Sequence, residues 1–215
     1  MANTNDVFDD LLNNKESYFV PESKKKSSNV APNVRGEFYG HLHNATMKEV
    51  SWKRDGNTYK AIVYNYEFLV DDANKSQSYE YISYTDNKKK QSAGKDYVGR
   101  SYRSGGVFRF LEPEDGDEFV SNADGNKSYL RFCETLGVEI ETKVVVMNGQ
   151  DVEVKCLPSL DTSEINGKPA IALVDKGKPY TTQDGKERTP YIVKFIQEWA
   201  DGKAKSMEAS DDIPF

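Results

Sequence analysis

From Gly36 onward, apolar and polar residues alternate in short runs that are separated by turn-forming pairs. Alternation with a period of two is typical of β-strands that have one buried face. Asn-Gly and Asp-Gly pairs between such runs favour tight hairpin turns. The pattern predicts strands at 36–50, 58–70, 76–84, 105–111, 142–147, 151–157, 168–175 and 189–199.

The first two runs also indicate which side chains face the core. In the first run, one strand face carries Phe38 and Leu42, and the other carries Tyr39, His41 and His43. In the second run, one face is entirely aliphatic or aromatic and is the predicted core face. It consists of Ile62, Tyr64, Tyr66, Phe68 and Val70.

One segment has the period of a helix instead. In residues 126–137, apolar side chains recur at i, i+3, i+4 and i+7, on Tyr129, Phe132, Cys133 and Leu136. Gly137 follows and can end the helix. Three strands, a helix and further strands are close to the order of an OB-fold, a five-stranded barrel that binds oligonucleotides. We therefore expect a mainly β protein, an OB-fold-like five-stranded barrel with one short helix, in which the hairpin at 144–155 is an insertion.

The amino-acid composition changes towards both ends of the chain. Residues 1–34 are polar and irregular and are expected to form an N-terminal arm. Residues 35–199 hold all the predicted strands and are expected to form a single domain. Residues 200–210 have no hydrophobic period, and residues 200–215 are expected to form a flexible, acidic C-terminal tail.

Composition narrows the class of protein. Only 37% of the 215 residues are hydrophobic, yet there are 13 Tyr and 10 Phe, and tyrosine suits half-wet surfaces. No apolar run is long enough to span a membrane, and the N-terminus lacks a basic-then-apolar signal. Two cysteines do not indicate a disulfide framework. We expect a cytoplasmic protein, without a metal or cofactor, that is compatible with a homo-oligomer.

The net charge of -6 conceals a basic segment. Residues 79–110 contain seven basic and three acidic residues, +7 - 3 = +4, so the remainder carries -10. The same window contains seven aromatic residues. Cations neutralise phosphates and ring faces stack on unpaired bases, so this mixture is typical of single-strand binding. The candidate DNA contacts are Tyr79, Tyr81, Lys88, Lys89, Lys90, Arg100, Tyr102, Arg103 and Arg109. The alternative interpretation is a solvated loop between strands whose aromatic residues are core.

A second basic segment lies between the last two predicted strands. In an OB-fold this loop is one of the two that clasp the nucleic acid strand. Its candidate contacts are Lys176, Lys178, Tyr180, Lys186 and Arg188. The alternative is an ordinary charged turn.

The chain ends on Asp211, Asp212, Ile213, Pro214 and Phe215. An acidic stub with an apolar tip suits a partner protein that has a basic rim and an apolar pocket. Burial of the tip would supply most of the affinity, and the carboxylates would steer the encounter.

This stub resembles the C-terminal tip of bacterial single-stranded DNA-binding proteins, which end on acidic residues followed by Ile-Pro-Phe. The whole chain more closely resembles phage-encoded single-stranded DNA-binding proteins, which pair a divergent OB-fold with an acidic tail. The resemblance implies sequence-independent binding of single-stranded DNA in the cytoplasm of the host. It also implies that the tail recruits replication, recombination and repair proteins and competes with DNA. The long Gly/Gln/Pro-rich linker of the bacterial family is missing, so its tetramer and wrapping mode are not implied.

Two other functions compete with this interpretation. The acidic cluster Glu112, Glu114, Asp115, Asp117 and Glu118 could hold a divalent metal in a nuclease, although a solvated acidic turn explains it as well. The tail could also belong to an adaptor that mimics the host tip and has no DNA affinity. No phosphate-binding Gly-x-x-x-x-Gly-Lys-Ser/Thr motif occurs, and no nucleophile motif accompanies the two histidines, so we expect no enzymatic activity.

Zinc ligand types are present in His41, His43, Cys133 and Cys156, but their spacing is not that of a zinc site.

Overall fold

The computed structural model describes residues 31–54, 57–83, 85–111 and 124–205. Its contacts divide the chain into Met1–Ala31 and Pro32–Phe215, and the elements below belong to the second unit. This unit is mainly β, as the alternating runs predict. No helix in the described ranges is long and apolar enough to cross a membrane.

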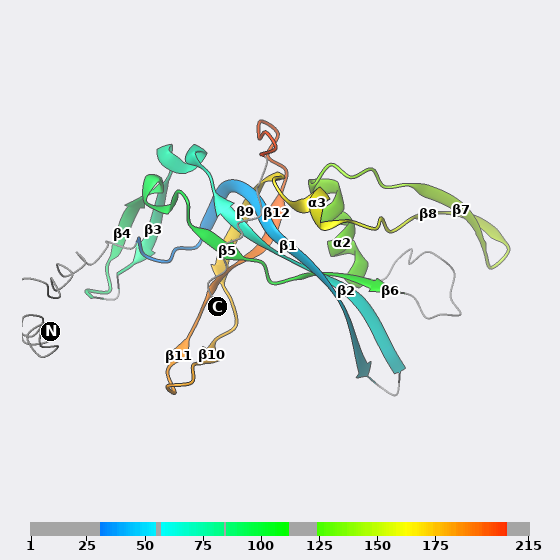
Figure 1. Cartoon of the computed structure of the whole chain (residues 1–215), viewed down its shortest axis with the longest axis horizontal. Coiled ribbons are helices and arrows are strands. Elements are labelled where there is room, and N and C mark those ends of the chain that lie inside the picture. The colour runs from blue at the N-terminus through cyan, green and yellow to red at the C-terminus, as the bar shows by residue number, and fades with distance from the viewer. Residues whose placement is uncertain (1–30, 55–56, 84, 112–123, 206–215) are drawn as a thin grey trace, which may run out of the picture. The chain divides into compact units, whose positions relative to one another are not determined.

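Six strands form the largest sheet, in the order β12-β9-β1-β2-β5, with β6 also pairing with β2. Every pair in these ladders is antiparallel. Figure 1 shows β1 and β2 as a long twisted ribbon. The strands are β1 (Gly36–Arg54), β2 (Asn57–Val70), β5 (Ser101–Arg103), β6 (Val107–Leu111), β9 (Pro169–Lys176) and β12 (Tyr191–Gln197).

The two ends of this strand order meet at one point. Ser104, directly after β5, forms an isolated parallel bridge with Val193 in β12. No ladder in the described residues extends this bridge, so the predicted closed barrel is not found there. The mainly β class is therefore confirmed, and among the described residues only this single bridge links the two ends of the sheet.

Three further hairpins pair only with themselves. The β7–β8 hairpin matches the insertion predicted at 144–155, and its turn has positive φ at Asn148 and Gly149. The β10–β11 hairpin lies in the connection between β9 and β12. The strands are β3 (Ser78–Ile82), β4 (Lys89–Ala93), β7 (Thr142–Met147), β8 (Gln150–Lys155), β10 (Tyr180–Thr181) and β11 (Glu187–Arg188).

The predicted helix is present as α2 (Asp124–Thr135). All four predicted apolar positions are buried, and Gly137 has φ +74° just after the helix. Tyr129 of α2 stacks on Tyr64 of β2 with ring centroids 5.4 Å apart. The remaining helices are short: α3 (Thr162–Ile165) and the 3₁₀ turns η1 (Asp72–Ser76) and η2 (Gly94–Tyr97).

The predicted core faces are largely confirmed. Phe38 and Leu42 are fully buried, as are Tyr64 and Phe68 from the facing strand. Tyr66 and Val70 are also buried, whereas Ile62 is only half-buried. His41, predicted on the face opposite Phe38, is buried as well, because its ring lies beside Trp199 at 5.7 Å between centroids.

A β-bulge in β1 changes which side chains face inward. The register between β1 and β2 shifts between His43 and Thr46. Before the shift, even-numbered Leu42 pairs with Phe68 on the inner face; after it, odd-numbered Met47 pairs with Tyr64. One extra residue reverses the facing of every later position, because side chains alternate with a period of two. The bulge therefore places Lys48, Val50 and Trp52 on the outer face.

Both predicted domain boundaries need correction. Residues 32–34 belong to the folded unit, not to an arm that ends at 34, because Val34 is buried and the Tyr97 hydroxyl donates to the Pro32 carbonyl oxygen at 2.9 Å. Residues 200–205 are docked rather than flexible. The Lys205 amide donates to Gly167 O at 3.0 Å, and its ammonium group pairs with Asp71.

We predict that Asp71 holds this docked segment in place. Burial alone would raise the pKa of Asp71, but hydrogen bonds from Lys205 and the Ala73 amide, with the charges of Lys205 and His41, hold that pKa below its usual value. A lowered folded-state pKa stabilises the fold above the unfolded value of about 4, and this stabilisation is lost as the pH falls. In a Trp52→Phe background, Trp199 fluorescence should therefore report release of the segment in acid.

The substitution Asp71→Asn should shift the Trp199 emission towards longer wavelength already at neutral pH, since Lys205 and His41 lose their charged partner. Asp72→Asn is the matched control, because Asp72 pairs with Lys75 on the same turn. Identical spectra and acid transitions for Asp71→Asn and the unaltered chain would disprove the role of Asp71.

Candidate nucleic-acid interface

Two of the predicted DNA contacts lie in the core instead. Tyr79 and Tyr102 are buried and pack on Phe38, with ring centroids 4.4 Å and 5.5 Å away. The Tyr79 hydroxyl lies 3.0 Å from both the Glu37 carbonyl oxygen and Asn74 Oδ1. A ring enclosed in this way cannot stack on a base, so both assignments are wrong. Of the two predicted alternatives, core packing holds for these tyrosines.

Two predicted arginines are engaged in packing rather than displayed on the surface. The Arg100 guanidinium lies over the Tyr97 ring at 5.2 Å and contacts the Tyr102 hydroxyl at 3.4 Å. Arg109 donates to the Leu157 carbonyl oxygen at 3.4 Å, and its Nε is buried without a hydrogen-bond partner among the described residues. Both side chains tie loops to the sheet, so neither is a surface cation as predicted.

The other predicted residues of the first basic segment are at the surface. Lys88, Lys89 and Lys90 are exposed at the β3–β4 hairpin, where Tyr81 is half-buried opposite Lys90. Arg103 is exposed and lies 3.4 Å from Glu67. Burial would raise the pKa of Glu67, but hydrogen bonds from Ser101 and Asn44 and the charges of His43 and Arg103 lower it. Glu67 is therefore ionised and Arg103 is paired.

The second basic segment is exposed, as predicted. Tyr180 of β10 lies directly opposite Arg188 of β11, with Lys178 and Lys186 nearby in sequence. The segment 176–188 carries four basic residues, including Lys176, against Asp184 and Glu187, which is +4 - 2 = +2. A ring and a guanidinium side by side on a protruding hairpin can contact a base and a phosphate together.

A row of aromatic side chains crosses the outer face of β1, β2 and β6, the face opposite α2. Trp52 pairs with Tyr59 across the ribbon, and Phe110 and Phe108 pair with Ala61 and Val63, two and four residues after Tyr59. Residues paired in this way share a face. Consecutive ring centroids are 5.8 Å (Tyr59–Trp52), 5.8 Å (Trp52–Phe110) and 6.1 Å (Phe110–Phe108) apart. We call these four residues the aromatic row.

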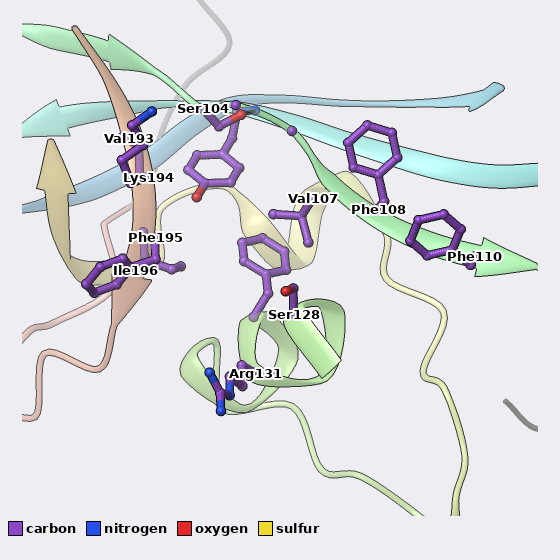
Figure 2. A pocket seen from close by; sticks show the side chains of 14 residues that line it. Ser104, Val107, Phe108, Phe110, Ser128, Arg131, Val193, Lys194, Phe195 and Ile196 are labelled. Atoms are coloured by element: carbon purple, nitrogen blue, oxygen red, sulfur yellow. Dashed lines mark hydrogen bonds between the residues drawn. The ribbon is translucent and has the colours of Figure 1, made fainter. Parts of the chain in front are cut away.

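The row ends at a groove between β6 and β12 with a volume of about 600 Å³. Figure 2 shows Phe108 and Phe110 on one side of it and Phe195 and Ile196 on the other, with Arg131 of α2 below. Phe195 is 52% exposed and Phe108 39%. Arg131 and Lys194 line the groove and are exposed, and Lys48 lies on the same face as the row. The surface thus combines ring faces with cations.

Sequence reasoning missed most of this surface. Phe195 follows Val193 at a spacing of two, which predicts a shared face, yet Val193 is buried and Phe195 is exposed. A register shift between them in the β12–β9 ladder causes the difference. Trp52 reaches the outer face only because of the bulge in β1, whereas Tyr59 lies there because it is out of phase with Tyr64 in β2. Arg131 could have been found, since it lies off the apolar face of the predicted helix.

Other predicted sites have different outcomes. The tail residues Asp211–Phe215 and the acidic cluster at 112–118 lie outside the described residues. Within the described ranges, no group of three or more His, Cys, Asp or Glu is placed to hold a metal ion. Both cysteines are free, and Cys133 is buried on α2.

Comparisons with protein-family models, with curated proteins and with solved structures find no match to this chain.

The distinction between buried and exposed tyrosines predicts opposite effects on stability. Tyr79→Ala should reduce the free energy of unfolding by about 3–5 kcal/mol, as for other large buried aromatic side chains. Tyr180→Ala, on the exposed hairpin, should change it by less than about 0.5 kcal/mol. Urea denaturation of both variants measures the difference. Equal unfolding midpoints would contradict the placement of Tyr79 in the core.

Proposed function

We propose that this chain binds single-stranded DNA without sequence preference and is not an enzyme. The observation that carries the proposal is the aromatic row, which adjoins a groove lined by further aromatic residues and two cations. Unpaired bases would stack on the row and in the groove, while Arg131, Lys194 and Lys48 contact the phosphates. A duplex covers its base faces, so this mode of binding favours single strands.

An open OB-fold-like barrel is the architecture that we propose. The order β12-β9-β1-β2-β5 supports this proposal when β1, β2, β5, β9 and β12 are counted as the five strands of the barrel. The parallel bridge between Ser104 and Val193 supports this interpretation, because it lies where the barrel would close. OB-folds bind oligonucleotides on the face of their second and third strands and on two loops, one of which corresponds to β10–β11.

The C-terminal tail would carry the second half of the function. The resemblance of residues 211–215 to the tip of single-stranded DNA-binding proteins supports recruitment of replication and recombination proteins in the cytoplasm of a phage-infected host. Lys205, the last described residue, is anchored by Gly167 and Asp71.

We predict that oligo-dT binds far more tightly than duplex DNA of the same length, with an affinity that falls steeply with salt. Phe108→Ala and Phe195→Ala should each weaken binding by about 5- to 150-fold, which corresponds to about 1–3 kcal/mol per stacked base. Met47→Ala is the matched control, because Met47 is exposed on the inner face of the same ribbon. Fluorescence anisotropy with labelled oligonucleotides measures all four proteins, and oligo-U tests whether RNA binds equally.

The same titration separates the alternatives. Loss of the labelled strand only in the presence of magnesium would indicate a nuclease. Absence of binding to any oligonucleotide at low ionic strength would refute the proposed DNA-binding face. The adaptor without DNA affinity would then be the remaining hypothesis. Equal losses for Met47→Ala and the two Phe variants would show that the aromatic row and the groove are not the site.

A second prediction concerns the tail. Deletion of residues 206–215 removes Asp211 and Asp212 but leaves Lys205 in place, so affinity for oligo-dT should be unchanged or higher. The truncated chain should at the same time fail to capture replication or recombination proteins that the full chain retains. Anisotropy and affinity capture measure the two properties on the same preparations. A truncated chain that no longer binds oligo-dT would show that the tail is part of the DNA site.

A further inference from the structure

The outer edge of β7 is an unprotected strand edge. Of the described strands, β7 pairs only with β8, and its other edge has no partner. Val144 and Val146 are 68% and 72% exposed, which are the highest values among the large hydrophobic side chains described. A two-stranded hairpin is at best marginally stable in water, and an exposed apolar edge readily pairs with another strand.

The two edges of this hairpin differ in a way that identifies the pairing edge. The β8 strand alternates charges along its length, with Asp151, Glu153 and Lys155. Charged side chains of this kind are how natural sheets prevent pairing at an edge. From Val144 to Met147, β7 has no charge, no proline and no bulge. Both strands of the hairpin are exposed to solvent, so exposure alone does not explain why only β8 carries the charges.

The backbone of the free edge has a defined phase. In a two-residue hairpin, the residues that flank the turn form a hydrogen-bonded pair, here Met147 and Gln150. The Cys156 amide donates to the Glu141 carbonyl oxygen at 2.8 Å, which continues the same phase at the base of the hairpin. Alternate residues of β7 therefore turn their amide and carbonyl groups away from β8, and these residues are Thr142, Val144 and Val146.

We propose that β7 pairs with β7 of a second copy of this chain, antiparallel and across a twofold axis at Val145. In this register Val144 lies opposite Val146 of the partner subunit, and both present their outward backbone groups to each other. Lys143 lies opposite Met147 of the partner subunit, so no like charges meet. The result is a four-stranded sheet, β8-β7-β7-β8, whose remaining edges are the charged ones. A twofold contact of this kind is self-complementary and closed.

A second copy is the occupant that the sequence of the edge favours. Valine opposes valine, and the one cation of the strand opposes an apolar side chain, so a single sequence supplies both halves. The pairing uses β7 alone and leaves the aromatic row, the groove and the β10–β11 hairpin without any role in it. It is therefore independent of the proposed DNA binding and is tested without DNA.

Disulfide trapping tests the register. Directly opposite residues in a non-hydrogen-bonded antiparallel pair have Cα atoms about 4.5 Å apart, within the range of a disulfide. In a Cys156→Ser background, Val145→Cys should form an interchain disulfide on mild oxidation, because Val145 faces itself. Val144→Cys should form little, since it faces position 146. The Cys156→Ser background alone is the control for crosslinking through Cys133, which is buried.

Sedimentation equilibrium tests the interface itself. The unaltered chain should show a dimer whose population rises with protein concentration. The variant Val144→Lys/Val146→Lys should lose the dimer, because lysines of the two copies would then lie opposite each other. Glu153→Lys, on the other strand of the hairpin, should keep it. A monomer at all concentrations, a dimer that persists in Val144→Lys/Val146→Lys, or a stronger crosslink for Val144→Cys than for Val145→Cys would each overturn the proposal.

Discussion

The bulge in β1 is the constraint on which the arrangement of the exposed surface depends. A strand has only two faces, so one inserted residue exchanges them for the rest of the strand. Leu42 is buried before the bulge, whereas Trp52 lies on the outer face after it, although both are even-numbered. The Ala45 amide donates to Asn166 Oδ1 at 3.0 Å, so a side chain from the α3–β9 connection satisfies a backbone group in the irregular part of the ladder.

This constraint explains why the fold could be predicted better than the candidate site. Strands and helices follow from the local period of apolar residues, and β1, β2, β9, β12 and α2 were all predicted within a few residues. Which face of the sheet a side chain occupies can be predicted along a long strand only if no bulge interrupts the alternation. The prediction held for Phe38 and Leu42 on one side of the bulge, but the sequence gives no sign of where the register shifts.

The tyrosines and arginines show a second limit of sequence reasoning. Tyr79 and Tyr102 were counted as surface residues because they alternate with charged neighbours, yet both pack on Phe38. The short strands and turns between β2 and β6 fold back over the first half of β1, and no local pattern reports such a tertiary contact. The tertiary contacts of Arg100 and Arg109 are equally absent from the local pattern. A long side chain can bury its stem while its guanidinium group donates hydrogen bonds to backbone oxygens.

Several exposed lysine and arginine side chains form ion pairs with neighbouring carboxylates. Lys90 pairs with Asp86 and Lys186 with Asp184, both at 2.9 Å, and Arg103 pairs with Glu67 at 3.4 Å. Exposed pairs of this kind contribute little to stability, so a phosphate could replace the carboxylate at little cost. In the proposed DNA binding, these carboxylates would be the counterions that the phosphates displace. A chain with a net charge of -6 can therefore have a local basic surface, because carboxylates next to the cations neutralise them.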